Sequence, residues 1–143
     1  MKRIYVGLIA SALLIGCGQT SEKEQSSGEK KLTVGVTMLS MQNEFIVKVS
    51  DEIDKKAQEL GVELVTVDAE RSALKQIEQV ESFIAQKVDV IIMNPCEVEA
   101  SSPAVTKALA ANIPIINVNS ATSAKPTAFV GSDDVESGRI AMK

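Results

Sequence analysis

Short polar side chains follow three segments of the sequence that are rich in β-branched residues. These polar stretches are 39–44, 94–99 and 119–123. They supply Asn43, Asn119 and Ser120, whose amides and hydroxyl can donate and accept hydrogen bonds at once, as each hydroxyl of a sugar requires. Phe45 adds a flat apolar surface of the kind that packs on the CH face of a sugar ring. These four side chains predict a site for an uncharged, hydroxyl-rich small molecule.

Each of these residues also has a purely structural interpretation. Asn43 can cap the helix that follows it, a role that is compatible with ligand contact. Considered alone, Phe45 is slightly more typical of a core residue at the start of a helix. Asn119, at a strand end, can satisfy the backbone of a loop. The residue types therefore leave a binding role and a structural role open at these positions.

The composition argues against an enzyme. The 143 residues include no His, which removes the commonest general base and the commonest metal ligand. The sequence also lacks a Gly-rich phosphate loop, a Cys-x-x-Cys pair and a calcium-binding loop. Three aspartates are interpreted as turn and cap residues: Asp68, Asp133 and Asp134. We therefore expect no catalytic residue, no metal ion and no cofactor.

The charge distribution argues against a nucleic-acid partner. The formal net charge is −4, and it becomes −6 without the first 17 residues, because Lys2 and Arg3 are their only charges. Phosphate contacts require a clustered basic face, and the sequence shows none.

The first 17 residues have the layout of a secretory signal. Lys2 and Arg3 precede an apolar stretch at 4–15, and small Gly16 precedes Cys17. The apolar stretch is shorter than the ~20 residues that a membrane-spanning helix needs, which makes a spanning helix the weaker alternative. Residues 14–17 also resemble the lipobox of bacterial lipoproteins. That resemblance implies that Cys17 becomes the first mature residue and carries a lipid.

Residues 18–30 contain no aliphatic or aromatic side chain, so they cannot bury enough surface to offset the entropy of ordering. We expect a flexible tether between a lipid anchor and a folded domain. The other cysteine, Cys96, then has no partner for a disulfide and is interpreted as a small, half-buried residue.

From residue 32 onward, short β-rich runs alternate with amphipathic runs, which predicts an α/β fold with a doubly wound parallel sheet. The expected strands are 32–38, 62–67, 88–93, 113–118 and 127–131. The first expected helix ends at Gly61 and buries a stripe from Ile46 to Leu60. The second spans 72–87 and buries the following residues: Leu74, Ile77, Val80 and Ile84. A third helix begins with Ser102 as its cap and Pro103 in its first turn, and three of its residues are expected against the sheet: Val105, Ala108 and Leu109.

The link between the last two expected strands is unusually short. Only residues 119–126 separate them, whereas parallel neighbours usually need a crossover of about a dozen residues. We therefore expect the strand at 127–131 to lead out of the domain. A further helix is predicted to start at Asp133, which is followed three residues later by Glu136.

Four segments, in order and at family spacing, resemble the type I periplasmic binding proteins for sugars. The resemblance covers the chain from about residue 32 to its end. The matching segments are Asn43-Glu44-Phe45, Asn94-Pro95, Asn112-Ile113-Pro114-Ile115 and 130–138. The resemblance implies a sheet of strand order 2-1-3-4-5 and a solute held between two lobes that close over it.

The resemblance also implies a role for each candidate residue. Asn43 and Asn119 would hydrogen-bond sugar hydroxyls, and Phe45 would stack on the ring. Ser120 stands where many relatives have a basic residue that grips the sugar. Ile46 stands where the ribose binders have a second ring-facing aromatic residue. Both departures set this sequence apart from the ribose binders.

The expected organisation is a lipoprotein signal peptide at 1–17, a tether at 18–30, a first lobe at 31–132 and the start of a second lobe at 133–143. With the second lobe missing, the chain alone is expected to bind solute very weakly. The expected function is substrate binding in an ABC-type sugar import system, with a permease as partner. The alternative is a sensory protein that presents a sugar to a membrane receptor. In either role the protein would be exported and held at the membrane by lipid on Cys17.

Overall fold

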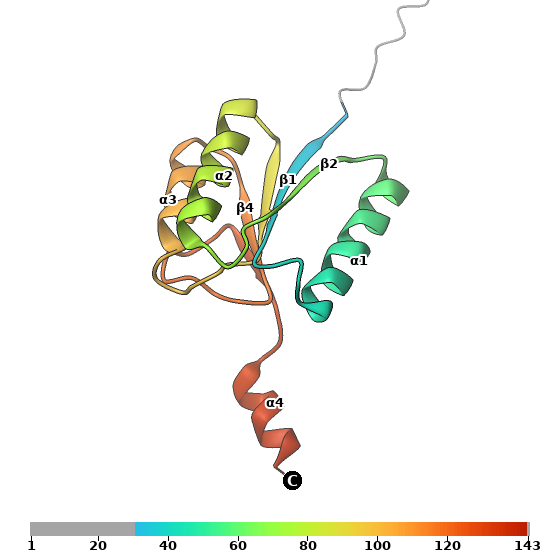
Figure 1. Ribbon diagram of the computed structural model, residues 1–143, viewed down its shortest axis with the longest axis vertical. Coiled ribbons are helices and arrows are strands. Elements are labelled where there is room, and N and C mark those ends of the chain that lie inside the picture. The colour runs from blue at the N-terminus through green and yellow to red at the C-terminus, as the bar shows by residue number, and fades with distance from the viewer. Residues whose placement is uncertain (1–30, 143) are drawn as a thin grey trace, which may run out of the picture.

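The computed structural model describes residues 31–142. In it the predicted β-rich runs form a parallel sheet, and amphipathic helices pack on both of its faces (Figure 1). Its elements are β1 (Thr33–Met38), α1 (Glu44–Leu60), β2 (Glu63–Asp68), α2 (Ala73–Gln86), β3 (Val90–Met93), α3 (Ser102–Ala110), β4 (Ile115–Val118), β5 (Ala128–Val130) and α4 (Asp134–Ala141). The predicted signal peptide, the tether and the lipidation residue Cys17 lie outside the described residues.

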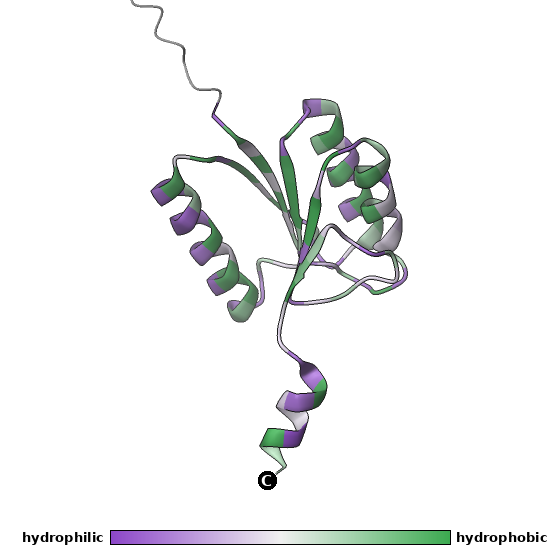
Figure 2. Ribbon diagram, turned by 180° about the vertical axis from the view of Figure 1, so that it is seen from behind, coloured by the Kyte–Doolittle hydropathy of each residue, from purple (hydrophilic) through white to green (hydrophobic). Residues whose placement is uncertain are grey.

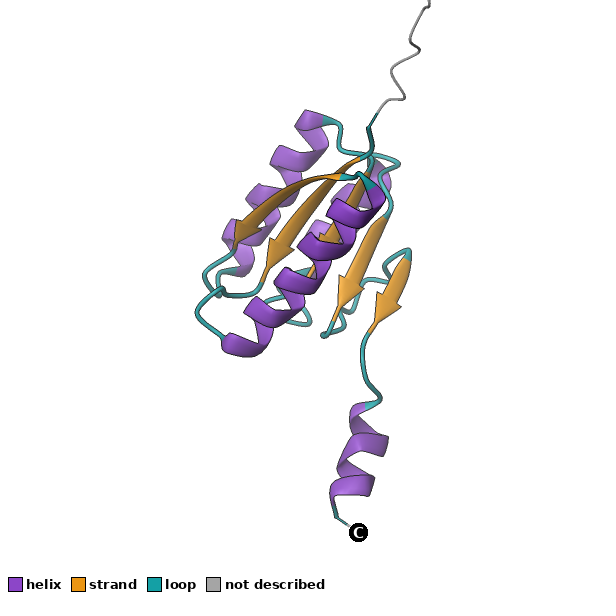
Figure 3. Cartoon of the chain, turned by 90° about the vertical axis from the view of Figure 1, so that its right-hand side faces the viewer, coloured by secondary structure: helices purple, strands orange, loops and turns teal. Residues whose placement is uncertain are grey.

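The sheet has the strand order β2-β1-β3-β4-β5, and each neighbouring pair is parallel. The predicted fold class and strand order are therefore confirmed. All the strands point the same way, so the loops that follow them gather at one edge of the sheet (Figure 3). The switch in strand order lies between β1 and β3, where the chain leaves β1 toward one face of the sheet and β3 toward the other.

Helix α1 covers one face of the sheet, and α2 and α3 cover the other (Figure 1). The buried residues form two clusters, one around β1 and α1 and a larger one formed by β3, β4, α2 and α3. Figure 2 shows apolar residues concentrated along the central strands. The two layers of helices bury this apolar sheet from both sides, which is the arrangement that parallel sheets require.

Helix α1 ends at Gly61, as predicted, because Gly61 adopts a left-handed conformation with φ 68°. Ile46 and Ala57 are buried against the sheet. The prediction that Leu60 is buried was wrong, since Leu60 is 66% exposed. The last turn of α1 stands away from the sheet (Figure 1), so little apolar surface is left to cover this side chain.

Helix α2 buries most of the predicted stripe, since Val80 is buried and Ile77 and Ile84 are partly buried and pack against the core. Leu74 is 68% exposed, whereas Gln76, Val80 and Phe83 are buried. Phe83 lies over Gly35 of β1, where an added Cβ would come within 2.6 Å of the ring. The sequence pattern was wrong about Leu74 and passed over Gln76 and Phe83, because it counted aliphatic residues.

The N-cap of helix α3 lies one residue before the predicted position. Ser101 is the N-cap, without a side-chain cap hydrogen bond, and Ser102 is the first helical residue. Pro103 lies in the first turn, as predicted. Val105 and Ala108 are buried, as predicted, whereas Leu109 is 40% exposed and does not pack as predicted.

Strand β5 joins the sheet without a crossover helix. Residues 119–127 run back along the α3 side, where Ser123 N–H donates to the Val98 carbonyl and Ala124 N–H to Ser102 Oγ, both at 3.1 Å. After β5 the chain leaves the sheet into α4, which lies beyond the carboxyl ends of the strands and buries no residue (Figure 3). Asp133 caps α4, as predicted, by accepting a hydrogen bond from Glu136 N–H at 2.9 Å. That 133–143 starts a second lobe stays a prediction.

Within residues 31–142, no helix combines the length and the apolar character needed to cross a bilayer.

Candidate functional site

A groove of about 710 Å³ runs between α1 and the edge formed by β4 and β5. Five apolar side chains line much of it: Phe45, Val49, Ile53, Val118 and Val130. Asn119 lines the same groove. Two of the four predicted site residues, Phe45 and Asn119, are therefore brought together by elements that are far apart in the sequence. Asn43 and Ser120 are direct neighbours of the groove in sequence but do not line it.

Asn43 caps α1. Its Oδ1 accepts hydrogen bonds from the backbone N–H groups of Phe45 at 2.9 Å and Ile46 at 3.4 Å. Its own backbone is extended, with φ −96° and ψ 118°, as an N-cap requires. The structural role of Asn43 is confirmed, and its place at the strand-end edge keeps the amide beside the groove.

Phe45 is exposed, which corrects the interpretation of this residue as part of the core. Its relative exposure is 57%, while Ile46, the next residue, is almost completely buried under α1. The first turn of α1 therefore turns Ile46 into the core and leaves the Phe45 ring on the groove. Ile46, which stands at the position of a second aromatic in the ribose binders, is a core residue here and offers no ring face to a ligand.

Asn119 directly follows β4 and adopts a left-handed conformation, with φ 65°, which Asn tolerates better than most residues. Its backbone N–H donates to the Val130 carbonyl at 2.8 Å, which ties the end of β4 to β5. Its Nδ2 donates to Ser120 Oγ at 3.4 Å, and Ser120 N–H donates to the Val118 carbonyl at 2.7 Å. The amide and the hydroxyl are thus adjacent polar groups on one turn.

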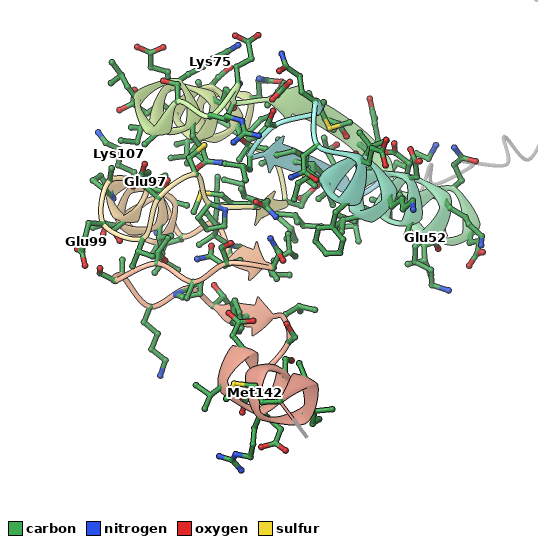
Figure 4. The ribbon with its side chains drawn as sticks, turned by 60° about the horizontal axis from the view of Figure 1, so that its bottom comes forward. Glu52, Lys75, Glu97, Glu99, Lys107 and Met142 are labelled. Atoms are coloured by element: carbon green, nitrogen blue, oxygen red, sulfur yellow. The ribbon has the colours of Figure 1, made fainter. Side chains whose placement is uncertain are left out.

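The remaining polar stretch of the three predicted, 94–99, contributes little to the groove. Asn94 and Pro95 are buried, and neither amide atom of the Asn94 side chain has a hydrogen-bond partner within the described residues. Glu97 and Glu99 are exposed on the α3 side, far from Glu52 on α1 (Figure 4). The loop after β3 therefore supports the strand ends from within and turns its charges away from the groove.

Sequence reasoning missed several groove residues. Lys48 and Glu52 of α1 line the groove. Val118 and Val130 also line it, because the register pairs them on neighbouring strands. A signal was present, since Val118 alternates with the buried Asn117 along β4 and must face the α1 side.

Cys96 is a free, half-buried cysteine, as predicted. Burial, with smaller contributions from the charges of Asp68 and Glu97, raises the pKa of its thiol to about 11. Its Sγ contacts the Leu39 carbonyl at 3.9 Å, so it lies between the loops after β1 and β3. A thiol held in its protonated form is a poor nucleophile and a poor metal ligand.

The arrangement suits noncovalent recognition of an uncharged ligand. It combines an exposed aromatic ring with amide and hydroxyl groups at the carboxyl ends of parallel strands. In the part of the chain that the structure describes, no three Cys, Asp or Glu side chains are grouped so as to hold a metal ion.

Comparison with known proteins gives a consistent family match. Residues 34–143 match the family model described as a periplasmic binding protein domain. The ribose import binding protein of Bacillus subtilis is 33% identical over 134 residues, which cover 90% of this chain and 44% of that protein. The xylitol-binding protein of Mycolicibacterium smegmatis is 32% identical over 141 residues, covering 96% of this chain and 40% of that protein. This chain thus spans less than half the length of these curated relatives, which are binding proteins and not enzymes.

Solved structures show the same fold. A Mycobacterium smegmatis protein in complex with β-D-fucofuranose superposes with a TM-score of 0.71 at 32% identity, covering 77% of this chain and 38% of that one. The Caulobacter myo-inositol binding protein, bound to myo-inositol, superposes with a TM-score of 0.72 at 27% identity, again covering 77% and 38%.

Proposed function

The chain belongs to the periplasmic binding protein domain family, and from this premise we propose that it forms one lobe of a solute-binding protein that captures a sugar or polyol for an ABC-type importer. The class of solute is inferred from the relatives. The names of two of them mention ribose and xylitol, and the solved structures hold myo-inositol and a fucofuranose. Each of these molecules is an uncharged compound that carries several hydroxyl groups.

One observation carries the proposal. Phe45 is exposed and lines the same groove as Asn119, at the strand ends beside the point where the strand order reverses. An exposed phenylalanine loses favourable burial unless something packs on it, and the apolar CH face of a sugar ring does so. The Asn119 amide then meets the hydroxyls at the edge of the ring. Asn43 and Ser120, which do not line the groove themselves but lie close to its lining residues in sequence, would add further donors and acceptors.

Export and membrane anchoring belong to the same proposal. Cys17 ends the apolar stretch at the N-terminus and would carry the lipid, and residues 18–30 would let the folded lobe reach a permease beside it. An anchored binding protein stays near its importer while its lobe moves in water.

A sensory role would require the same solute binding from this lobe, because a receptor and a permease would both bind the solute-bound form. Deletion of the gene separates the two roles. Loss of sugar uptake with an intact transcriptional response supports import, and the reverse result supports sensing.

Solute binding is tested by NMR on the full chain, labelled with ¹⁵N and kept in mild detergent because of its apolar N-terminal stretch. Ribose, xylitol and myo-inositol are titrated separately, with leucine as a solute without a sugar-like ring. A single lobe covers only one side of a ligand, so we expect millimolar affinity. The expected result is a set of amide shifts confined to residues 43–46 and 119–120.

Matched variants make this test specific. Phe45→Ala and Asn119→Gly should abolish the shifts, and glycine preserves the positive φ at 119. The controls are Phe129→Ala, which removes an exposed ring outside the groove, and Asn112→Gly, at another left-handed asparagine. The proposal fails if no carbohydrate shifts these amides, or if the controls lose the response as completely as the site variants.

A further inference from the structure

Helix α2 carries a buried glutamine that the groove does not use. Gln76 is fully buried, and its side chain both donates a hydrogen bond to the loop after β3 and accepts one from it. Its Nε2 donates to the Asn94 carbonyl at 2.8 Å, and its Oε1 accepts from Cys96 N–H at 3.0 Å. The same Nε2 lies 3.5 Å from Thr37 Oγ1 near the end of β1. One amide therefore joins the ends of two neighbouring strands.

A second glutamine, almost one turn further along α2, extends these contacts. Gln79 Oε1 accepts from Thr37 Oγ1 at 2.7 Å, and Gln79 Nε2 donates to the Asp68 carbonyl at 2.8 Å. Thr37 belongs to β1 and is fully buried, and Asp68 is the last residue of β2. The two glutamines together hold the carboxyl ends of β1, β2 and β3 on one face of α2.

These strand ends are the starting points of the loops at the site edge. Residues 39–43 leave β1 and lead to Asn43 and Phe45. The Leu39 carbonyl accepts from Arg71 N–H at 2.8 Å, which links this loop to the segment after β2. A shift of the β1 end relative to α2 would therefore carry Asn43 and Phe45 with it.

The side-chain type matters here because each position needs a donor and an acceptor at once. Leucine fits a buried site of this size but leaves the Asn94 carbonyl and the Cys96 N–H without partners. A glutamate carboxylate can accept from Cys96 N–H but cannot donate to the Asn94 carbonyl. Protonation of that carboxyl restores the missing donor.

From these contacts we propose that Gln76 and Gln79 are positioning residues for the sugar site: they fix the loop at 39–43, and with it the Phe45 ring and the Asn43 cap, against the ends of β2 and β3. The proposal rests on the proposed function for its effect on affinity. Its effect on the order of the loops does not depend on any ligand.

The test compares Gln76→Glu with the wild-type full chain by NMR titration with whichever of ribose, xylitol and myo-inositol gives the larger shifts, at pH 5 and pH 9. We expect sugar affinity about tenfold weaker than wild type at pH 9, from the lost donor, and recovery at pH 5. The titratable groups beside this position are Cys96, Asp68 and Glu97, and the wild-type titration at both pH values accounts for them.

Two control variants separate positioning from stability. Gln86→Glu changes an exposed glutamine on the same helix, bonded only locally to Ser82 Oγ, and should match wild type at both pH values. Val105→Ala truncates a buried α3 residue and should lower stability without changing affinity. Equal weakening of Gln76→Glu at pH 5 and pH 9, or wild-type affinity at both, would overturn the proposal.

A second readout keeps the proposal testable without a ligand. Amide hydrogen exchange at Asn43 and Cys96 should be at least about tenfold faster in Gln76→Leu and Gln79→Leu than in Gln86→Leu, because the buried partners are lost. If the wild-type chain responds to no sugar, the proposed function fails while this exchange result still decides the positioning role. Unchanged exchange in both leucine variants would refute it.

Discussion

At Asn43, one side-chain oxygen already serves the backbone, and this limits what the residue can offer a ligand. Oδ1 accepts two backbone N–H groups at the start of α1. A hydroxyl of the solute would therefore be met mainly by Nδ2 as a donor. The cap and the ligand contact use different atoms of the same amide, so they do not compete.

Substitution of Asn43 separates these two roles. Asn43→Ala should lower the free energy of unfolding by about 1 kcal/mol, because the α1 cap is lost, whereas Asn43→Ser should keep most of it. Both variants lack the Nδ2 donor and should lose sugar-induced shifts alike. Urea unfolding of the full chain measures the first effect. Equal stability of the two variants would show that the cap contributes nothing.

The Cys96 thiol should be slow to react near neutral pH. Burial raises its pKa to about 11, so the thiol stays protonated to a higher pH than an exposed cysteine. In a Cys17→Ser chain, alkylation by iodoacetamide at pH 8 should be on the order of a hundredfold slower than for an unfolded control in urea. The rate should climb with pH up to about 11. A plateau near pH 9 would contradict the raised pKa.

At the scale of elements, the contact between α2 and the sheet depends on the absence of a side chain at Gly35. The Phe83 ring occupies the space in which a Cβ would lie, with ring atoms at 2.6 Å. Gly35→Ala should therefore destabilise the fold by roughly 1–3 kcal/mol, through overpacking. Denaturant unfolding gives the value.

Gly138 provides the matched control for this substitution. A Cβ added there meets no atom within 4 Å, and α4 packs on nothing within the described residues. Gly138→Ala should leave stability unchanged or raise it slightly, because alanine favours a helix over glycine. A similar loss in both variants would point to a general intolerance of glycine replacement and not to the Phe83 contact.

Hydrophobic periodicity predicted where the helices lie better than which of their apolar residues are buried. It found the first two helices and their ends, because Gly61 and Ser72 carry local signals that do not depend on packing. It misassigned Leu60 and Leu74, both of which are exposed. Whether an apolar residue near a helix end is covered depends on how far the sheet extends beneath it, and no local pattern contains that information.

At the scale of the whole molecule, the two faces of the sheet are unequally covered. Two helices pack on one face and α1 alone on the other, which leaves the β4–β5 edge open as the groove (Figure 1). The exposed Val130 and the half-buried Val118 follow from this asymmetry. They make the groove more apolar than the four predicted site residues alone would suggest.

The proposed membrane attachment involves the whole chain and can be tested without knowledge of the solute. Expressed in a bacterium with lipoprotein processing, the chain should incorporate labelled palmitate and fractionate with membranes. Cys17→Ser should abolish both, because it removes the sulfur that is proposed to carry the lipid, whereas Cys96→Ser should change neither. Palmitate on the Cys17→Ser chain would place the modification elsewhere.

The strand order was implied by the family resemblance. Local patterns in the sequence predicted the α/β class, the caps at Asn43 and Asp133 and the positions of the polar strand-end loops. These follow from local chemistry and from the rule that parallel strands end at one edge. Tertiary packing alone placed Phe45 on the surface, brought Asn119 to the same groove, and set Gln76 and Gln79 against the strand ends. Those outcomes depend on contacts between residues from 11 to 74 positions apart, whose geometry is set by packing of the whole sheet and not by any neighbouring residue.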